Sequence, residues 1–534
     1  MPAADLVING TVLTVDDAQP TAEAIAISDG RIVAVGSRAD VESWIGPDTQ
    51  TLDTGDGCVM PGLVEAHGHP LMEAIVLSDR MVDIRPVTMR DADEVVAAIR
   101  SEVAKRGSDG AFLVGWDALL QTGLPDPTLA WLNETAPDSP LVIIHNSGHK
   151  AFFNTAAAAS AGITRDTPDP KGSKYGHDAN GDLDGTAEES AAVFSLLMAA
   201  IDPGAYPAML LAELGRLNRA GLTTCSEMAF DGSFRPVLEQ MRDELTVRLR
   251  VYEMSNPSMA TDMNPVNGDD MFRQVGIKIW WDGSPWIGNI DLSFPYLDTD
   301  ATRSIGVTPG SCGHANYTRE QLVEIVGAYF PKGWPMSCHV QGDAGVDPIL
   351  DIYEDALRRW PRDDHRLRLE HVGAISDAQL QRAHDLGVTC SIFVDQIHYW
   401  GDIIVDGLFG TEHGSRWMPC GSAVKTGMRI SLHNDPPVTP EEPLRNISVA
   451  ATRTAPSGRV IGPEQRITVE QAIRAQTIDA AYQLFADDII GSLEVGKYAD
   501  MVMLSADPRT VPPEEIADLE VRATFLAGKQ VYGQ

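Results

Sequence analysis

The two ends of the chain show short runs of alternating hydrophobic and polar residues, the pattern of β-strands. Ala24–Ser28 and Arg31–Gly36 are joined by an Asp-Gly turn, and Val521–Tyr532 repeats the pattern near the C-terminus. A hairpin or two on its own is marginally stable in water, so neither end is expected to fold alone. We predict that residues 1–57 together with 488–534 form one small β-sandwich domain.

The middle of the chain alternates apolar, β-rich runs with helical patterns. This alternation is typical of βα units and a parallel sheet. The predicted strands are Cys58–Val64, Leu141–His145, Leu222–Glu227, Val247–Glu253, Gly276–Trp281, Met336–Val340, Arg366–His371, Val388–Phe393 and Arg429–His433. The predicted helices are Ser190–Ile201, Tyr206–Ala220, Arg319–Tyr329, Val346–Arg359, Ser376–Leu386 and Val469–Phe485.

Nine predicted strands exceed the eight of a (β/α)8 barrel, and the gap between the first run and Leu222 is too long for one crossover. An inserted subdomain at about residues 70–200 resolves both problems if it contains Leu141–His145. The predicted fold class is therefore α/β. It comprises a (β/α)8 TIM barrel over residues 58–487, the small β-sandwich domain, and the insertion after the first barrel strand.

Charge and composition narrow the partners of the protein. The chain has 41 basic and 76 acidic residues, a net charge of −35, which argues against nucleic acid or an anionic membrane as a partner. It shows no apolar run long enough for a membrane span and no secretory signal. Its six scattered cysteines fit reduced thiols. We expect a cytoplasmic protein that acts on a small molecule, with a homodimer as an open possibility.

Histidine carries the first chemical signal. His67 and His69 flank Gly68 directly after the first barrel run, and alternate residues of a strand point the same way. Both imidazoles can therefore face one ligand, although two surface histidines remain the alternative. His339, His371 and Asp435 fall at or just past the C-terminal ends of later strands, the face where barrel enzymes collect their catalytic groups.

Imidazole and carboxylate groups that converge in this way predict a metal site that suits zinc. Lys278 lies inside an apolar strand at the same face, where a free ammonium is costly to bury. The lysine therefore needs a neutralising partner or a modification. Carbamylation would convert it into an anionic bridge between two metal ions.

Seven segments in this order and spacing are similar to one known family. They are Val59–His69, Gly148–Asn154, Gly276–Gly283, His339–Ala344, Leu369–His371, Leu432–Asp435 and Gly491–Asp500. The chain resembles the amidohydrolase superfamily over essentially its whole length, and in particular the YtcJ-like branch that includes N-substituted formamide deformylases.

The resemblance implies roles for the residues of the predicted metal site. His67 and His69 would hold the first metal ion, and Lys278, as its carbamate, would bridge to the second. His339 and His371 would hold the second ion. Asp435 would contact the first ion and shuttle the proton. One or two zinc ions are both compatible with the sequence, and the last three residues are also the predicted catalytic groups.

Further residues are predicted around this centre. By resemblance His149 lies on the substrate side, and a structural histidine is the alternative. Asp282 orients Lys278, binds substrate or is structural. Asp343 near His339, together with His433, is expected to support the ligands from behind.

Aromatic residues near the catalytic face predict an apolar pocket for the substrate. The candidates for its wall are Trp281, Trp286, Phe152 and Trp400, with a core position as the alternative for each. No arginine pair stands ready to bind a phosphate or carboxylate. We therefore expect a neutral, hydrophobic substrate such as an N-aryl or N-benzyl amide or formamide.

The predicted reaction is hydrolysis of a C–N bond by a metal-activated hydroxide, because zinc lowers the pKa of bound water to about 7. Two alternatives use the same centre. One is deamination, or hydrolysis of a cyclic amide or carbamate. The other is decarboxylation or retro-aldol cleavage of an apolar substrate. The products distinguish these reactions.

Overall fold

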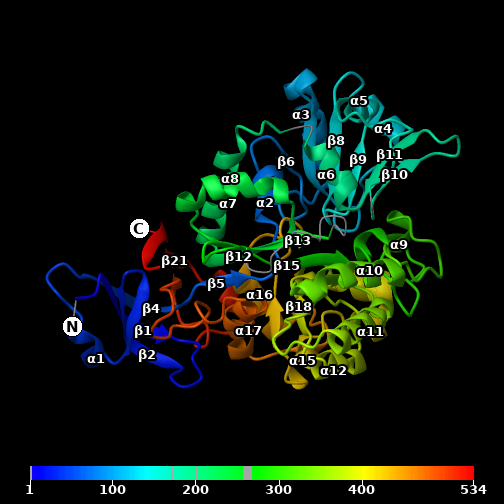
Figure 1. Ribbon diagram of the computed structural model, residues 1–534. Coiled ribbons are helices and arrows are strands. Elements are labelled where there is room, and N and C mark those ends of the chain that lie inside the picture. The colour runs from blue at the N-terminus through cyan, green and yellow to red at the C-terminus, as the bar shows by residue number, and fades with distance from the viewer. Residues whose placement is uncertain (1–2, 171, 199–200, 256–266, 534) are drawn as a thin grey trace.

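The computed structural model describes residues 3–170, 172–198, 201–255 and 267–533. Within these ranges the strands form three sheets, which Figure 1 shows as a β-sheet at the lower left, a central barrel surrounded by helices, and a further sheet above the barrel.

The first sheet combines strands from both ends of the chain. Its seven strands follow the order β22-β21-β20-β4-β1-β2-β3, and β20 pairs antiparallel with β4. The bounds are β1 (Leu6–Leu13), β2 (Thr21–Ser28), β3 (Arg31–Gly36), β4 (Gln50–Pro61), β20 (Met501–Leu504), β21 (Val521–Leu526) and β22 (Lys529–Gly533), with the short helix α1 (Arg38–Glu42) after β3. The domain boundaries inferred from the sequence stay a prediction, which limited proteolysis would test.

The second sheet is the barrel. Its eight parallel strands follow the order β5-β12-β13-β15-β16-β17-β18-β19 and nearly close into a ring, which confirms the predicted fold class. The bounds are β5 (Leu63–Glu65), β12 (Leu222–Phe230), β13 (Arg248–Met254), β15 (Phe272–Trp280), β16 (Met336–Val340), β17 (Arg368–His371), β18 (Thr389–Ile392) and β19 (Ile430–Leu432). The two-residue strand β14 (Asn267–Gly268) pairs with β15 outside this order.

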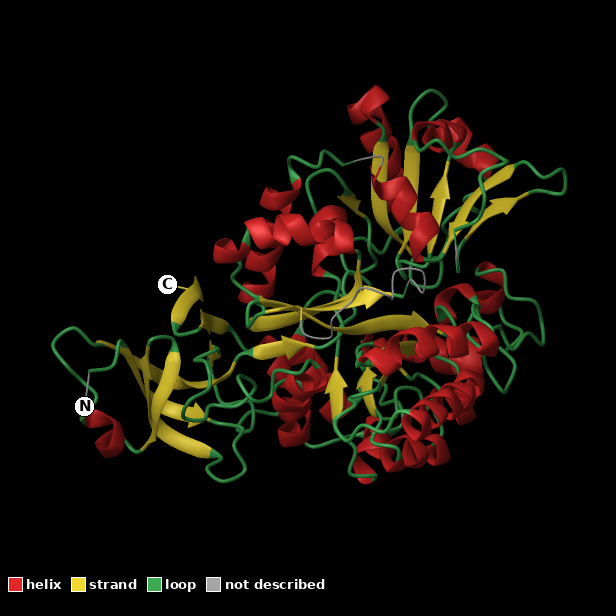
Figure 2. Cartoon of the chain, viewed as in Figure 1, coloured by secondary structure: helices red, strands yellow, loops and turns green. Residues whose placement is uncertain are grey.

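Helices pack around the barrel (Figure 2). Helix α11 shows why: Val346, Ile349, Leu350 and Tyr353 recur at helical spacing and are buried. The bounds are α7 (Tyr206–Arg219), α8 (Arg235–Gln240), α9 (Asp300–Ser304), α10 (Arg319–Tyr329), α11 (Asp343–Arg359), α12 (Asp377–Asp385), α13 (Gln396–Ile403), α14 (Gly410–Gly414), α15 (Cys420–Lys425), α16 (Pro443–Thr452), α17 (Val469–Ala475) and α18 (Ile478–Gln483). Of the helices in the described ranges, none has both the length and the apolar character that crossing a membrane requires.

Two of the predicted elements differ from the structure. The run Cys58–Val64 is not one barrel strand, because β4 ends at Pro61 in the first sheet and β5 begins at Leu63 in the barrel. Gly62 is the junction: a Cβ there would lie 2.2 Å from Thr223 Oγ1, so only glycine allows this close approach to β12. The predicted helix Val469–Phe485 is divided into α17 and α18.

The third sheet belongs to the predicted insertion. Its strands follow the order β10-β11-β9-β8-β7-β6, so Leu141–His145 lies outside the barrel as expected. The strands are β6 (Val82–Asp83), β7 (Ala111–Trp116), β8 (Leu141–His145), β9 (Lys150–Phe153), β10 (Lys174–His177) and β11 (Leu183–Glu188). The helices of this region are α2 (Pro70–Val76), α3 (Ala92–Arg106), α4 (Leu129–Thr135), α5 (Thr155–Ser160) and α6 (Ser190–Met198). Residues 199–200 of the predicted helix Ser190–Ile201 lie outside the described residues.

Candidate metal centre

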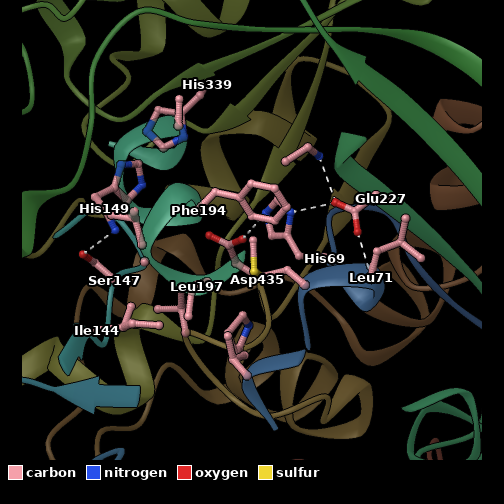
Figure 3. Close-up of a pocket in the computed structure, with 18 of the residues that line it drawn as sticks. His69, Leu71, Ile144, Ser147, His149, Phe194, Leu197, Glu227, His339 and Asp435 are labelled. Carbon is pink, nitrogen blue, oxygen red and sulfur yellow. Dashed lines mark hydrogen bonds and ion pairs between the residues drawn. The ribbon is translucent and has the colours of Figure 1, made fainter. Parts of the chain in front are cut away.

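One cavity of about 270 Å³ opens at the C-terminal ends of the barrel strands. Its walls include all six residues predicted as metal ligands: His67, His69, Lys278, His339, His371 and Asp435. Figure 3 shows Asp435 beside His69 in this cavity, with His149 and His339 on its other side. The strands of a parallel barrel thus bring together groups that lie far apart in the sequence.

His67, His69 and Asp435 form the first group. The Asp435 Oδ1 lies 3.6 Å from His67 Nε2 and 3.4 Å from His69 Nε2, and the three ligand atoms lie within 4.8 Å of one another. The opposite ring nitrogens are held by carboxylates: His67 Nδ1 lies 2.6 Å from Glu370 Oε2, and His69 Nδ1 lies 3.1 Å from Glu227 Oε1. Carboxylates that orient imidazoles in this way are typical of metal sites.

The protonation of the two imidazoles follows from their surroundings. Burial lowers the pKa of His67 well below its usual value, so the ring is neutral, the form that binds a metal. Burial also opposes the charge on His69, but Asp435 and Glu227 outweigh it and raise the pKa to about 9. The two carboxylates therefore favour a positive charge at this point, either a proton or a metal ion.

Glu370 fixes the orientation of His67 in this group. Its carboxylate accepts hydrogen bonds from Arg368 and Ser337, and both members of the Arg368–Glu370 pair are fully buried. Burial alone would raise the pKa of Glu370, but the guanidinium of Arg368 holds it below its usual value. An ionised Glu370 thus accepts the Nδ1–H of His67, which leaves Nε2 free to face the cavity.

His339 and His371 form the second group, with ring centroids 4.4 Å apart. His339 Nε2 lies 2.7 Å from the Gly283 carbonyl oxygen, and His371 Nδ1 lies 3.1 Å from His433 Nε2. Among the described residues nothing hydrogen-bonds the buried His371 Nε2. Burial lowers the pKa of both imidazoles well below the usual value. Neutral rings with a free nitrogen fit a divalent metal of borderline softness such as zinc.

His433 lies next to His371, on the side of its Nδ1. Its Nδ1 lies 2.8 Å from Ser391 Oγ, so the Ser391 hydroxyl and the imidazole form a chain that fixes His371. His433 also stacks on His67 with ring centroids 4.7 Å apart. It therefore supports residues of both groups.

Lys278 lies between the two groups. Its Nζ is buried and lies 3.4 Å from His67 Nε2, and burial lowers its pKa to about 8. A buried amine of reduced basicity among uncharged imidazoles is consistent with the predicted carbamate, which would place anionic oxygens between the groups.

The backbone directs two of these side chains. Successive residues of a regular strand point to opposite faces, yet Glu370 contacts His67 while its neighbour His371 lines the same cavity. His371 has φ 69° and Asp435 has φ 52°, in the left-handed region that non-glycine residues rarely adopt. Such strain is typical of functional sites.

His149 extends from the insertion into the cavity. Its Nδ1 lies 2.8 Å from Glu189 Oε2, while Glu189 Oε1 accepts hydrogen bonds from Asn289 and Asn316. Its ring centroid lies 5.3 Å from that of His339 (Figure 3). Burial opposes protonation of His149, but Glu189 raises its pKa. The insertion therefore supplies an imidazole N–H donor beside the second group.

The rest of the cavity wall is mainly apolar. Helix α6 contributes four of the lining residues, and among the described lining residues there is no arginine. The apolar lining consists of Leu71, Met72, Val76, Val114, Ile144, Ala191, Val193, Phe194, Leu197, Ala229, Phe234, Met254, Trp280, Pro437 and Val438. This wall suits a neutral, hydrophobic substrate.

The aromatic residues predicted for this wall lie elsewhere. Trp280 rather than Trp281 lines the cavity, because neighbouring strand residues point to opposite sides, and the Trp281 Nε1 donates to Asp291. Trp286 and Trp400 stack on each other with centroids 4.6 Å apart and are buried. Phe152 packs against Trp116 in the core of the insertion.

Two predicted carboxylates serve the backbone instead. The buried Asp282 accepts hydrogen bonds from the backbone N–H groups of Gln341, Gly342 and Asp291, and thereby fixes the turn after β16. Asp343 begins α11 and accepts hydrogen bonds from the backbone N–H and hydroxyl of Ser293. In the described hydrogen bonds neither carboxylate contacts Lys278.

Glu370, Glu189 and Glu227 do not belong to the site predicted from the sequence. For Glu370 and Glu227 the available signal was a glutamate inside a predicted barrel strand. Such a residue must have a partner when it is buried, as Glu370 has in Arg368 and His67.

Comparison with known proteins also indicates a metal-dependent hydrolase. A model described as "Amidohydrolase family" matches residues 50–532. An N-substituted formamide deformylase from Arthrobacter pascens is 26% identical and covers 98% of this chain and 97% of its own length. Protein LONG AFTER FAR-RED 3 from Arabidopsis thaliana is 27% identical, with coverage of 99% and 91%. The putative amidohydrolase YtcJ from Bacillus subtilis is 23% identical, with coverage of 98% of both chains.

Solved structures share the fold. An uncharacterised metal-dependent hydrolase from Pyrococcus horikoshii superposes with a TM-score of 0.73 at 22% identity, covering 95% of this chain and 99% of its own. An adenosine deaminase from Xanthomonas campestris with bound zinc gives a TM-score of 0.55 at 15% identity, with coverage of 100% and 94%.

Proposed function

The chain belongs to the amidohydrolase family, a metal-dependent family that acts on C–N bonds, and we propose that it is a zinc-dependent hydrolase of neutral, hydrophobic N-substituted amides or formamides. The observation that carries the proposal is the meeting of histidine and carboxylate ligands with an apolar cavity. The similarity to a named formamide deformylase over nearly the whole chain supports the same substrate class.

In this proposal His67, His69 and Asp435 would hold one zinc ion, and His339 and His371 would hold a second. Lys278, as its carbamate, would be a shared ligand. When bound, zinc supplies a Lewis acid and lowers the pKa of a coordinated water to about 7. The ligand set fits zinc because it consists mainly of neutral imidazoles, including the buried and unpaired Nε2 of His371.

Asp435 is the proton carrier of the proposed reaction. Its carboxylate reaches both groups: Oδ1 lies 3.4 Å from His69 Nε2, and Oδ2 lies 3.8 Å from His371 Nδ1. From this position it can take the proton of the attacking water and give it to the leaving amine. The side chain is 14% exposed, so it faces the space where substrate binds.

His149 is the proposed partner of the substrate carbonyl oxygen. Glu189 fixes its ring through Nδ1, so Nε2 is the nitrogen left for the cavity. An N–H donor held in place before the reaction stabilises negative charge that develops on oxygen. His149 therefore orients the carbonyl, while His339 lies beside it.

The insertion sets the specificity in this proposal. Val193, Phe194 and Leu197 on α6 cover the cavity with apolar surface. Each buried methylene of a substrate contributes about 0.8 kcal/mol. Longer or aromatic N-substituents are therefore expected to be turned over better than small ones.

A screen of N-acyl amines with the zinc-loaded protein tests the proposal. The acyl group is varied from formyl to benzoyl and the amine from methyl to benzyl, and both products are quantified. We expect the amine and the acid in equal amounts, with kcat/KM rising with apolar size. Release of ammonia from a cyclic substrate, or of carbon dioxide, would instead support deamination or decarboxylation at the same centre.

Two further predictions accompany this function. A cytoplasmic location is tested by fractionating the source cells. A homodimer is tested by sedimentation of the purified protein.

A further inference from the structure

Three glutamates meet behind the cavity, outside the histidine centre. Glu73 lies on α2, Glu213 lies on α7, and Glu441 lies just before α16. One carboxylate oxygen from each lies within 4.8 Å of the other two. Helices α2 and α7 pack side by side, as Figure 1 shows, so the cluster joins three segments distant in sequence.

Two of these carboxylates are buried, and most of the oxygens in the cluster have no hydrogen-bond donor among the described residues. Glu73 and Glu213 have no exposed surface. Both oxygens of Glu73, Oε1 of Glu213 and Oε1 of Glu441 have no hydrogen-bond partner among the described residues. Only the second oxygen of Glu213 is bonded, to the guanidinium of Arg216. Buried polar atoms are almost always paired, so four unpaired oxygens at one place call for a ligand.

Nearby positive charge does not satisfy the cluster. The positive charge of Arg85 acts to lower the pKa of Glu73, but the hydrogen bonds of its guanidinium go to Asp83 and to the Pro437 carbonyl oxygen. Burial and the neighbouring glutamates raise the pKa of Glu73 well above its usual value, and burial and Glu441 raise that of Glu213 to about 8. The cluster therefore takes up either protons or a cation.

We propose that Glu73, Glu213 and Glu441 bind one hard divalent cation, Ca²⁺ or Mg²⁺, at a site separate from the histidine centre. The ligand set contains only oxygen, which Ca²⁺ and Mg²⁺ prefer, and it lacks the imidazole or thiolate ligands typical of structural zinc sites. Oxygens that coordinate Ca²⁺ at about 2.4 Å can lie at most about 4.8 Å apart, and the three glutamate oxygens lie within that limit. None of the three glutamates lines the substrate cavity.

The location gives this cation a positioning role. Glu73 follows the His67-Gly68-His69 loop on the next helix, and Glu441 follows Asp435 in the segment that leads to α16. A cation bound to both glutamates fixes α2 against that segment. It thereby fixes the spacing of His69 and Asp435, whose ligand atoms lie 3.4 Å apart.

Metal analysis of the zinc-loaded protein tests the proposal. The protein is dialysed with Ca²⁺ alone or Mg²⁺ alone in zinc-containing buffer, and bound metals and the thermal unfolding midpoint are measured. We expect one equivalent of Ca²⁺ or Mg²⁺ in addition to zinc, and a midpoint that rises with its concentration to a plateau. The cation that binds at lower concentration is the one that the site prefers.

Variants separate this site from the histidine centre. Glu441→Gln and Glu73→Gln are expected to lose the added equivalent and the rise in the midpoint, whereas the exposed Glu412→Gln retains both. His69→Ala is expected to lose zinc but retain Ca²⁺ or Mg²⁺, so a failure of the zinc proposal would not be mistaken for a failure here. Glu441 is partly exposed, which makes its variant the one that folds most readily.

The wild-type protein alone can overturn the proposal. Absence of the added equivalent at millimolar Ca²⁺ and at millimolar Mg²⁺, with an unchanged midpoint, would show that the carboxyl groups share protons instead. Binding that persists unchanged in both Glu73→Gln and Glu441→Gln would also contradict it.

Discussion

Glu370 and Glu227, which bond to His67 and His69, allow a direct test of the metal centre. Both carboxylates contact an imidazole in the same way, but only Glu370 is also paired with a buried arginine. Glu370 and Glu227 each hold the Nδ1 of one imidazole, at 2.6 and 3.1 Å. Replacing either by glutamine removes the charge and keeps the shape. Loss of such a supporting carboxylate typically weakens metal binding by about 10–100-fold. We expect both Glu370→Gln and Glu227→Gln to weaken zinc binding by a factor in that range.

Their effects on folding should differ. Glu370 neutralises Arg368, and both side chains are fully buried, so Glu370→Gln leaves a buried guanidinium without its counter-charge. Breaking a buried pair in this way costs about 3–5 kcal/mol. Glu227 accepts its other hydrogen bonds from the backbone N–H groups of Leu71 and Ala229, which glutamine can still satisfy in part. Glu227→Gln should therefore cost only about 1–3 kcal/mol.

Two measurements on each variant separate these effects. Zinc affinity is obtained by competition with a chromophoric chelator, and stability from denaturant unfolding of the metal-free protein. The reasoning predicts similar losses of zinc affinity and a clearly larger loss of stability for Glu370→Gln. Equal unfolding midpoints in the two variants would refute the role of the Arg368–Glu370 pair, and unchanged zinc affinity in both would refute the orienting role of the carboxylates.

Two further predictions concern turnover and specificity. Asp435→Asn is expected to retain most of its zinc but to lose kcat by orders of magnitude, measured by amine release. The control Asp343→Asn alters a carboxylate bonded to Ser293 and should keep a kcat near that of the wild type. Normal turnover in Asp435→Asn would exclude Asp435 as the proton carrier. Phe194→Ala should raise KM for an N-benzyl substrate by about tenfold or more, because the ring lines the apolar wall, and should leave KM for an N-methyl substrate nearly unchanged. Equal changes in KM for both substrates in steady-state assays would contradict that contact.

The barrel could be predicted from the sequence because short β-rich runs alternate with helical patterns along the chain. The exception at Gly62 shows the limit of such patterns. Cys58–Pro61 and Leu63–Glu65 look like one run, yet they belong to different sheets, and the close approach of Gly62 to Thr223 is a tertiary contact. No periodicity along the chain encodes it.

The positions of the predicted ligands could be inferred because the C-terminal ends of parallel strands meet at one face of the barrel. The location of His339 and His371 at strand ends was therefore enough to predict that they lie together. The substrate wall was not predictable in the same way. Trp286 and Trp400 follow strands as expected, but they stack on each other, while Phe194 reaches the cavity from the insertion. Which aromatic side chain faces a cavity depends on packing between distant segments.

The central claim is that the histidine centre, loaded with zinc, hydrolyses a hydrophobic amide. It is tested most directly by removing metal from the purified protein, restoring zinc in steps, and measuring release of benzylamine and formate from N-benzylformamide at each step. We expect that the metal-free protein is inactive, that activity rises in proportion to zinc bound, and that the two products appear in equal amounts. Undiminished release of benzylamine by protein that holds no metal would contradict it.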